Sequence, residues 1–242
     1  MAEPLLLIPG MMCDARLFTP QITEFSAERA VHVASIARCE SIGDMAHTIL
    51  QTAPKQFALA GLSMGAMVAM EIVRRAPERV TRVALMSTNS QSETPAVAAS
   101  REPQIVGVLA GRLPEIMQDV MRPEYLAAGP ERVKVLTLIQ DMALALGEGE
   151  FVRQSKALQR RPDQQKTLRK IRMPTLVLCG AEDTLTPPRR HQFMSELIPY
   201  ATLKIIDGAG HVPTIEAPEA TNAALREWLN APLMLTAGRV LA

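Results

Sequence analysis

One serine of this sequence has the setting of a nucleophile: Ser63, in the segment Gly61-Leu62-Ser63-Met64-Gly65. A Gly-x-Ser-x-Gly segment places its serine on a sharp turn between a strand and a helix, because the glycines leave room where side chains would collide. A serine hydroxyl is a poor nucleophile at neutral pH, so it needs a base and a group that orients the base. The alternative is a glycine-rich turn whose serine has no chemical role.

The candidate base is His211, one of four histidines in the chain. It alone sits in a loop directly after an expected strand, in the segment Gly208-Ala209-Gly210-His211, whose glycines allow a tight turn. His32 lies in a strand pattern, and His47 and His191 lie in helical patterns. For these three we expect packing or surface roles.

The orienting acid is expected after another strand and between the serine and the histidine in the chain. Asp183 and Glu182 both qualify, because they follow the strand-like run Thr175–Cys179. Glu93, which follows an earlier strand-like run, is a weaker alternative. The residues alone leave this choice open.

Acyl transfer at Ser63 also needs two hydrogen-bond donors aimed at the developing oxyanion. One is expected to be the backbone N–H of Met64, directly after the serine. The other is expected from the loop after the first strand, where the N–H of Met11 is the candidate. Both roles belong to the main chain, so the side chains stay free to line a pocket.

Short apolar runs and helical patterns alternate along the chain. The runs predict strands buried on both faces of a parallel sheet, at 5–8, 30–36, 57–62, 80–86, 175–179 and 202–206. Helical patterns cover 41–52, 64–76, 187–198 and 216–229. This alternation predicts a three-layer α/β fold with a mostly parallel sheet.

Residues 90–170 contain no strand-like run, but they carry helical patterns at 114–121 and 131–146. This stretch is too long for an ordinary connection between two strands. We therefore expect a core formed by 1–89 and 171–242, with 90–170 as a helical lid over the carboxyl ends of the strands, where ligands bind in such sheets. The alternative is that these helices form one more layer of the core.

Four segments, taken in order, resemble the α/β-hydrolase superfamily, in its small lid-bearing branch of carboxylesterases and enol-lactone hydrolases. They are LLLIPG, GLSMGAMVAMEIVRRAPERV, PTLVLCGAEDTLTPP and GAGHVPTIEAPEATNAALREWL. The resemblance implies that Ser63 is the nucleophile, His211 the base and Asp183, rather than Glu182, the acid. It covers nearly all of the chain outside the lid and implies neither a metal nor an organic cofactor.

The sequence departs from the family at two points. The usual His-Gly before the oxyanion loop is Pro9-Gly10 here, so the support of this loop is an open question. The chain also begins at what corresponds to the third strand of the family. We therefore expect a sheet of about six parallel strands, without the family's first two.

Composition excludes several other classes of protein. The 242 residues carry 26 Lys and Arg against 25 Asp and Glu, a balance that argues against a nucleic-acid partner. Three cysteines without a CxxC pair indicate neither a disulfide framework nor a zinc site. No apolar run approaches the length of a membrane helix. We expect a cytoplasmic protein, a monomer or homodimer, that does not associate with membranes.

Methionine is abundant and flexible, and it adapts to the shape of a ligand. A tolerant substrate pocket is expected to include Met12, Met117, Met121 and Met142. Four arginines are candidates for binding a substrate carboxylate: Arg16, Arg122, Arg153 and Arg161. The sequence does not decide between a neutral ester and an anionic lactone.

The expected reaction is hydrolysis of a small ester, thioester or lactone through an acyl-enzyme on Ser63. Two alternatives keep the same residues and change the bond: carbon–carbon hydrolysis and cofactor-free perhydrolysis. A third is a receptor that binds a ligand without catalysis. The complete set of serine, histidine and acid argues against a receptor, which has no need of all three.

Overall fold

The computed structural model describes residues 2–233, so the last part of the expected core, 234–242, lies outside the described residues. One sheet contains six strands in the order β2-β1-β3-β4-β5-β6, and every pair is parallel. The strands are β1 (Leu5–Ile8), β2 (Val31–Val33), β3 (Phe57–Leu62), β4 (Val80–Met86), β5 (Thr175–Gly180) and β6 (Ala201–Ile206). The expected sheet of six parallel strands is confirmed.

The inner strands are mostly apolar because both faces of the sheet are covered. In β1, for example, Leu5 and Leu7 belong to one core cluster, and Leu6 and Ile8 belong to the other. This is the two-residue alternation of a strand, with an apolar layer on each side. The edge strand β6 is less buried, which fits its mixed sequence Ala-Thr-Leu-Lys-Ile-Ile.

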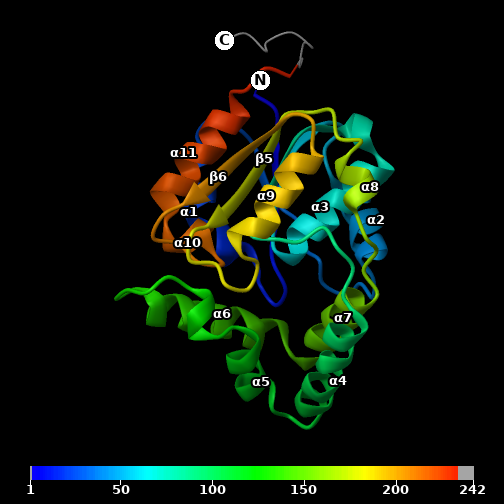
Figure 1. Ribbon diagram of the computed structural model, residues 1–242, viewed down its shortest axis with the longest axis vertical. Helices are drawn as coiled ribbons and strands as arrows, with labels where there is room; N and C mark the ends of the chain where they lie inside the picture. The colour runs from blue at the N-terminus through cyan, green and yellow to red at the C-terminus, as the bar shows by residue number, and fades with distance from the viewer. Residues whose placement is uncertain (1, 234–242) are drawn as a thin grey trace.

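Helices cover both faces of the sheet, which confirms the three-layer fold (Figure 1). On one face lie α1 (Thr19–Phe25) and α11 (Pro218–Leu229). On the other lie α2 (Ile42–Thr52), α3 (Met64–Arg75), α8 (Gln165–Leu168) and α9 (Pro188–Leu197). Short turns of helix complete the connections: η1 (Ala15–Phe18), η2 (Pro77–Arg79), η3 (Pro123–Tyr125) and α10 (Pro213–Glu216).

Four helices between β4 and β5 stand beyond the carboxyl ends of the strands (Figure 1). They are α4 (Pro95–Leu109), α5 (Leu113–Val120), α6 (Arg132–Leu146) and α7 (Glu148–Gln159). We call residues 95–159 the helical insertion. Of these helices, α5 and α6 begin and end within one residue of the sequence expectation. None of the helices in residues 2–233 is long and apolar enough to cross a membrane.

The turn between β3 and α3 depends on two glycines that allow backbones to touch. A Cβ on Gly61 would lie 2.4 Å from the carbonyl oxygen of Gly65, and a Cβ on Gly65 would lie 2.1 Å from that of Ile8. Between them, Ser63 has φ of 55° and ψ of −114°, a left-handed conformation that costs a non-glycine residue free energy. The close contact therefore holds α3 against the end of β1 and fixes the serine on its turn.

We predict that Gly65→Ala destabilises the fold by more than about 2 kcal/mol, because the added methyl group overlaps the Ile8 carbonyl. Gly149→Ala is the matched control. Both glycines are the second residue of a helix, but a Cβ at Gly149 meets nothing nearer than 3.6 Å. The control should be neutral or slightly stabilising. Urea denaturation measures both, and equal effects would contradict the packing argument.

Candidate active site

The structure brings Ser63, His211 and Asp183 together at the carboxyl ends of β3, β6 and β5. The Nε2 atom of His211 lies 3.1 Å from the Oγ of Ser63, and its Nδ1 lies 3.0 Å from the Oδ2 of Asp183. An ionised carboxylate only accepts hydrogen bonds, so Nδ1 carries the proton and Nε2 is free to accept the serine proton. The three side chains form one continuous hydrogen-bonded chain.

Asp183 is 1% exposed, and the turn that carries it satisfies its oxygens. Oδ1 accepts hydrogen bonds from the backbone N–H groups of Leu185 and Thr186, and Oδ2 accepts one from the Thr186 hydroxyl. Burial alone would raise the pKa of Asp183. The nearby His211 and the Thr186 hydrogen bonds outweigh burial, so the pKa lies below its ordinary value. The carboxylate is therefore charged at neutral pH and holds the His211 ring in one orientation.

The two other candidate acids have different partners. Glu182 is exposed, and its carboxylate accepts a hydrogen bond from the backbone N–H of Ala128 in the helical insertion. Glu93 forms ion pairs with Arg101 and Arg161. Only Asp183 of the three is hydrogen-bonded to His211.

A second histidine, His191, stabilises the strained turn at Ser63 through Thr88. The backbone N–H of Ser63 donates to the Met86 carbonyl, and the Thr88 hydroxyl donates to the Ser63 carbonyl at 2.8 Å. The N–H of Thr88 in turn donates to Nε2 of His191 at 2.8 Å. Burial lowers the pKa of His191 from 6.5 to about 4, so this ring is neutral and can accept the bond. The sequence indicated only a packing or surface role for His191.

The expected oxyanion donors flank Ser63. A Cβ on Gly10 would lie 3.4 Å from the Cβ of Ser63, so the loop after β1 passes directly beside this serine. Neither the Met11 nor the Met64 N–H donates to another protein group within residues 2–233. Both are therefore free to donate to a ligand.

The helical insertion supports this loop, which answers the question raised by Pro9-Gly10. Met12 has a positive φ of 53°, and its N–H donates to the side-chain oxygen of Gln154 at 2.8 Å. Gln154 lies on α7, is buried, and donates from Nε2 to Glu150. A side chain 142 residues away thus fixes the turn that presents the Met11 N–H.

The histidine loop is also held by the insertion. The N–H of His211 donates to the Tyr125 carbonyl at 2.7 Å, and a Cβ on Gly210 would lie 2.4 Å from that same oxygen. Glu216 ties the two segments together with its carboxylate. It accepts hydrogen bonds from the N–H groups of Gly210, Val212 and Ala127.

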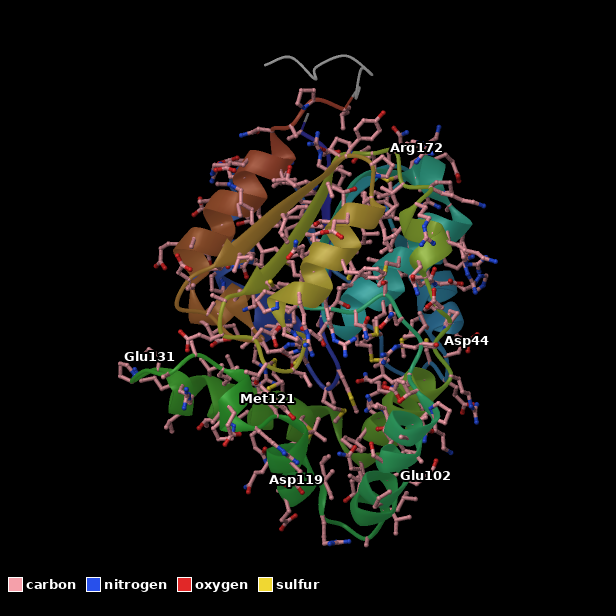
Figure 2. The ribbon with its side chains drawn as sticks, viewed as in Figure 1. Asp44, Glu102, Asp119, Met121, Glu131 and Arg172 are labelled. Carbon is pink, nitrogen blue, oxygen red and sulfur yellow. The ribbon has the colours of Figure 1, made fainter. Side chains whose placement is uncertain are left out.

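A cavity of about 490 Å³ opens onto Ser63 and His211 between the sheet and the insertion. Met117 and Met121, both expected in the pocket, line it, and Figure 2 shows Met121 where the insertion faces the strand ends. Met12 and Met142 do not line the cavity. Both side chains are fully buried in the same core cluster, where the sulfur of Met142 also accepts a hydrogen bond from the Asp14 N–H.

The candidate arginines divide into two groups. Arg122 and Arg161 line the cavity. Arg16 is paired with Asp14 and Arg153 with Glu150, and neither lines the cavity. A cysteine, Cys13, lies in the same wall, where burial first and the Asp14 charge second raise the pKa of its thiol to about 12. This thiol is therefore protonated at neutral pH.

The sequence matches Hydrolase_4, the family described as serine aminopeptidase, S33, over residues 26–218. The chain belongs to this family. The α/β-hydrolase resemblance seen in the sequence is thereby confirmed.

Two relatives have names that describe ester and lactone chemistry. The chain is 23% identical to a pimeloyl-[acyl-carrier protein] methyl ester esterase of Neisseria meningitidis, over 76% of this chain and 60% of that protein. It is 30% identical to 3-oxoadipate enol-lactonase 2 of Acinetobacter baylyi, over 70% of this chain and 62% of that protein. The chain thus matches about six tenths of the length of each relative.

Solved structures show the same fold. A thermophilic esterase from Thermogutta terrifontis, with malate bound, has a TM-score of 0.83 and 26% identity, covering 95% of this chain and 90% of that one. The enol-lactonase from Burkholderia xenovorans LB400 has a TM-score of 0.82 and 20% identity, covering 96% and 92%. The likeness extends over the sheet and the helical insertion alike.

We predict that His191 makes the stability of the fold depend on pH. The unfolded chain takes up a proton at His191 below pH 6.5, whereas the folded chain does so only near pH 4. Stability is therefore lost as pH falls from 6.5 to 4, by up to about 3 kcal/mol. In urea denaturation across this range, His191→Gln should show a flatter pH dependence than the wild type.

His47→Gln is the control for this measurement, because His47 is exposed on α2. It should keep the wild-type pH dependence. If His191→Gln keeps it as well, His191 is not the buried neutral group described above.

Proposed function

We propose that the protein hydrolyses a small carboxylic ester, thioester or lactone through an acyl-enzyme on Ser63. The observation that carries the proposal is the hydrogen-bonded chain from Ser63 through His211 to Asp183, with the serine hydroxyl facing a cavity. The relatives named as an esterase and an enol-lactonase support the same class of bond.

In the proposed reaction, the Oγ of Ser63 attacks the substrate carbonyl while Nε2 of His211 accepts its proton. The charged Asp183 stabilises the imidazolium that forms. The oxyanion accepts hydrogen bonds from the Met11 and Met64 N–H groups. His211 then gives its proton to the leaving oxygen or sulfur, and the carbon–heteroatom bond breaks. A water molecule, deprotonated by His211, releases the acid and restores Ser63.

Residues 90–170, which contain the helical insertion, are proposed to act as the lid of this site, over a core formed by 1–89 and 171–242. Met117 and Met121 from the insertion line the cavity, and Met67 lines it from α3. Methionine side chains adjust to the shape of an apolar ligand. A substrate with an apolar acyl or alkyl part fits this wall.

We predict that a fluorophosphonate probe labels the wild-type protein but not Ser63→Ala. The reason is that only a serine activated by a base attacks such phosphorus centres at neutral pH. Intact-mass spectrometry detects the added group, and circular dichroism confirms that the variant is folded. Absence of labelling in the folded wild type would refute the proposal and favour a receptor.

A panel of p-nitrophenyl esters of graded chain length, with lactones and β-diketones, then identifies the bond. Turnover of esters or lactones that is lost in Ser63→Ala supports the proposal. Turnover restricted to β-diketones, or to peracid formation with hydrogen peroxide, would replace it by carbon–carbon hydrolysis or perhydrolysis.

We predict that Gln154→Leu lowers kcat by about tenfold or more with a smaller change in KM. The Met12 N–H loses its acceptor, so the loop that presents the Met11 N–H relaxes, and one oxyanion donor is worth about 100-fold or more in related sites. The matched control is Gln159→Leu on the same helix, whose amide bonds Ala98 and Glu102 instead. Equal loss of kcat in both variants would indicate general damage to α7.

A further inference from the structure

The lining of the cavity beside Ser63 has a larger excess of basic over acidic residues than the chain as a whole. Among the described residues, its lining includes four arginines but only two carboxylates. They are Arg101, Arg122, Arg161 and Arg190, with Glu93 and Asp119. Over the full sequence, by contrast, basic residues exceed acidic ones by a single charge.

Two of these arginines share one buried carboxylate. Glu93 has a side chain that is 1% exposed and lies 2.6 Å from Nη2 of Arg101 and 2.8 Å from Nη1 of Arg161. Arg101 donates hydrogen bonds to both oxygens of this carboxylate, whereas Arg161 donates to only one. One carboxylate cannot neutralise two guanidinium groups. A net positive charge therefore remains in a wall where the Arg161 side chain is only 10% exposed.

Arg161 still has a donor to offer. Its Nε donates to the Gln91 carbonyl and its Nη1 to Glu93, but its Nη2 donates to no group within residues 2–233. Burial lowers the pKa of Arg161. The charges of Arg101 and Arg190 lower this pKa further, and the charge of Glu93 raises it. The site therefore holds this cation at a cost that an incoming anion would relieve.

Arg190 supplies a second guanidinium without a partner. It lies in the first turn of α9, just after the loop that carries Asp183, and its side chain is half-buried in the cavity wall. It forms no side-chain hydrogen bond or ion pair with the described part of the chain. The charges of Arg161 and Arg190 influence each other, which places them in the same region of the cavity.

We propose that Arg190 and Arg161 bind a carboxylate of the substrate, so that the preferred ester or lactone carries a second, ionised carboxyl group in its acid half. This inference rests on the proposed function of Ser63. Guanidinium groups match the planar carboxylate with paired hydrogen bonds, and the methionines of the wall accommodate the methylene groups between the two ends. The acid half stays bound through both acylation and deacylation, so its anchoring assists both steps.

The other two arginines of the cavity are already engaged. Arg101 is held by both oxygens of Glu93. Arg122 donates from Nε to the Asp119 carbonyl and is exposed, so water solvates its remaining donors, in contrast to those of the largely buried Arg161. This leaves the free Nη2 of Arg161 and the guanidinium of Arg190 as the anion site.

The test compares p-nitrophenyl esters of simple fatty acids with mono-p-nitrophenyl esters of dicarboxylic acids of the same chain length. The measured quantity is the ratio of kcat/KM for the carboxylate ester to that for its neutral counterpart. We expect Arg190→Met to lower this ratio by about tenfold or more, since a charged hydrogen bond contributes about 1.5–3 kcal/mol. Arg189→Met is the matched control, because Arg189 is the preceding residue, is exposed and does not line the cavity.

The control separates a local contact from a general effect of charge. Both variants remove one positive charge from the same turn of α9, but only Arg190 lines the cavity. A wild type that prefers neutral esters at every chain length would overturn the inference. So would an equal fall of the ratio in Arg190→Met and Arg189→Met.

Calorimetry on Ser63→Ala tests the anion site without catalysis. A failure of the anion-site proposal can therefore be distinguished from a failure of the proposed hydrolysis. Free dicarboxylates should bind Ser63→Ala and Ser63→Ala/Arg189→Met, but bind Ser63→Ala/Arg190→Met more weakly by about tenfold or more. Loss of binding in the Arg190 variant supports the site even if no ester is turned over. Tighter binding of inorganic phosphate than of any dicarboxylate would overturn the assignment to a carboxylate.

Discussion

Contact between backbones at the end of β1 and β3 is the constraint on which the site depends. Gly61 and Gly65 let the strand ends and the first turn of α3 approach more closely than any side chain would allow, and Ser63 is held between them at a positive φ. Such a conformation costs about 1–3 kcal/mol and persists only where the surroundings fix it. Here the Met86 carbonyl and the Thr88 hydroxyl fix it, and every partner of the serine is placed relative to this point.

The loops that carry Met11 and His211 contain glycine, and neither is held by its own sequence alone. Gln154 fixes the loop that carries Met11, Tyr125 accepts a hydrogen bond from the N–H of His211, and Glu216 joins the histidine loop to the insertion. Parallel strands bring Ser63, Asp183 and His211 to one edge of the sheet. Residues of the helical insertion then supply hydrogen-bond partners that the loops do not find within their own sequences.

Local patterns were sufficient to predict the sheet and to single out Ser63 and His211, whereas the choice of Asp183 over Glu182 needed the family resemblance. Each strand is an apolar run, and Ser63, Asp183 and His211 each follow such a run within a few residues. What local patterns could not show are contacts between distant segments, such as Gln154 with Met12. They also missed α4, which carries an internal proline and buries few residues, so its periodicity is weak. Arg190 gives no signal either, because its place in the cavity depends on how α9 packs.

The hydrogen bonds between the insertion and the loops limit how this protein can diversify. A cap that merely covered a site could be exchanged, shortened or lost while the chemistry beneath it survived. Here two parts of the insertion, the turn around Tyr125 and the middle of α7, hold the loops that carry His211 and Met11. New substrate ranges should therefore arise through changes in α4 and α5, while these two contact points remain as a condition for any activity.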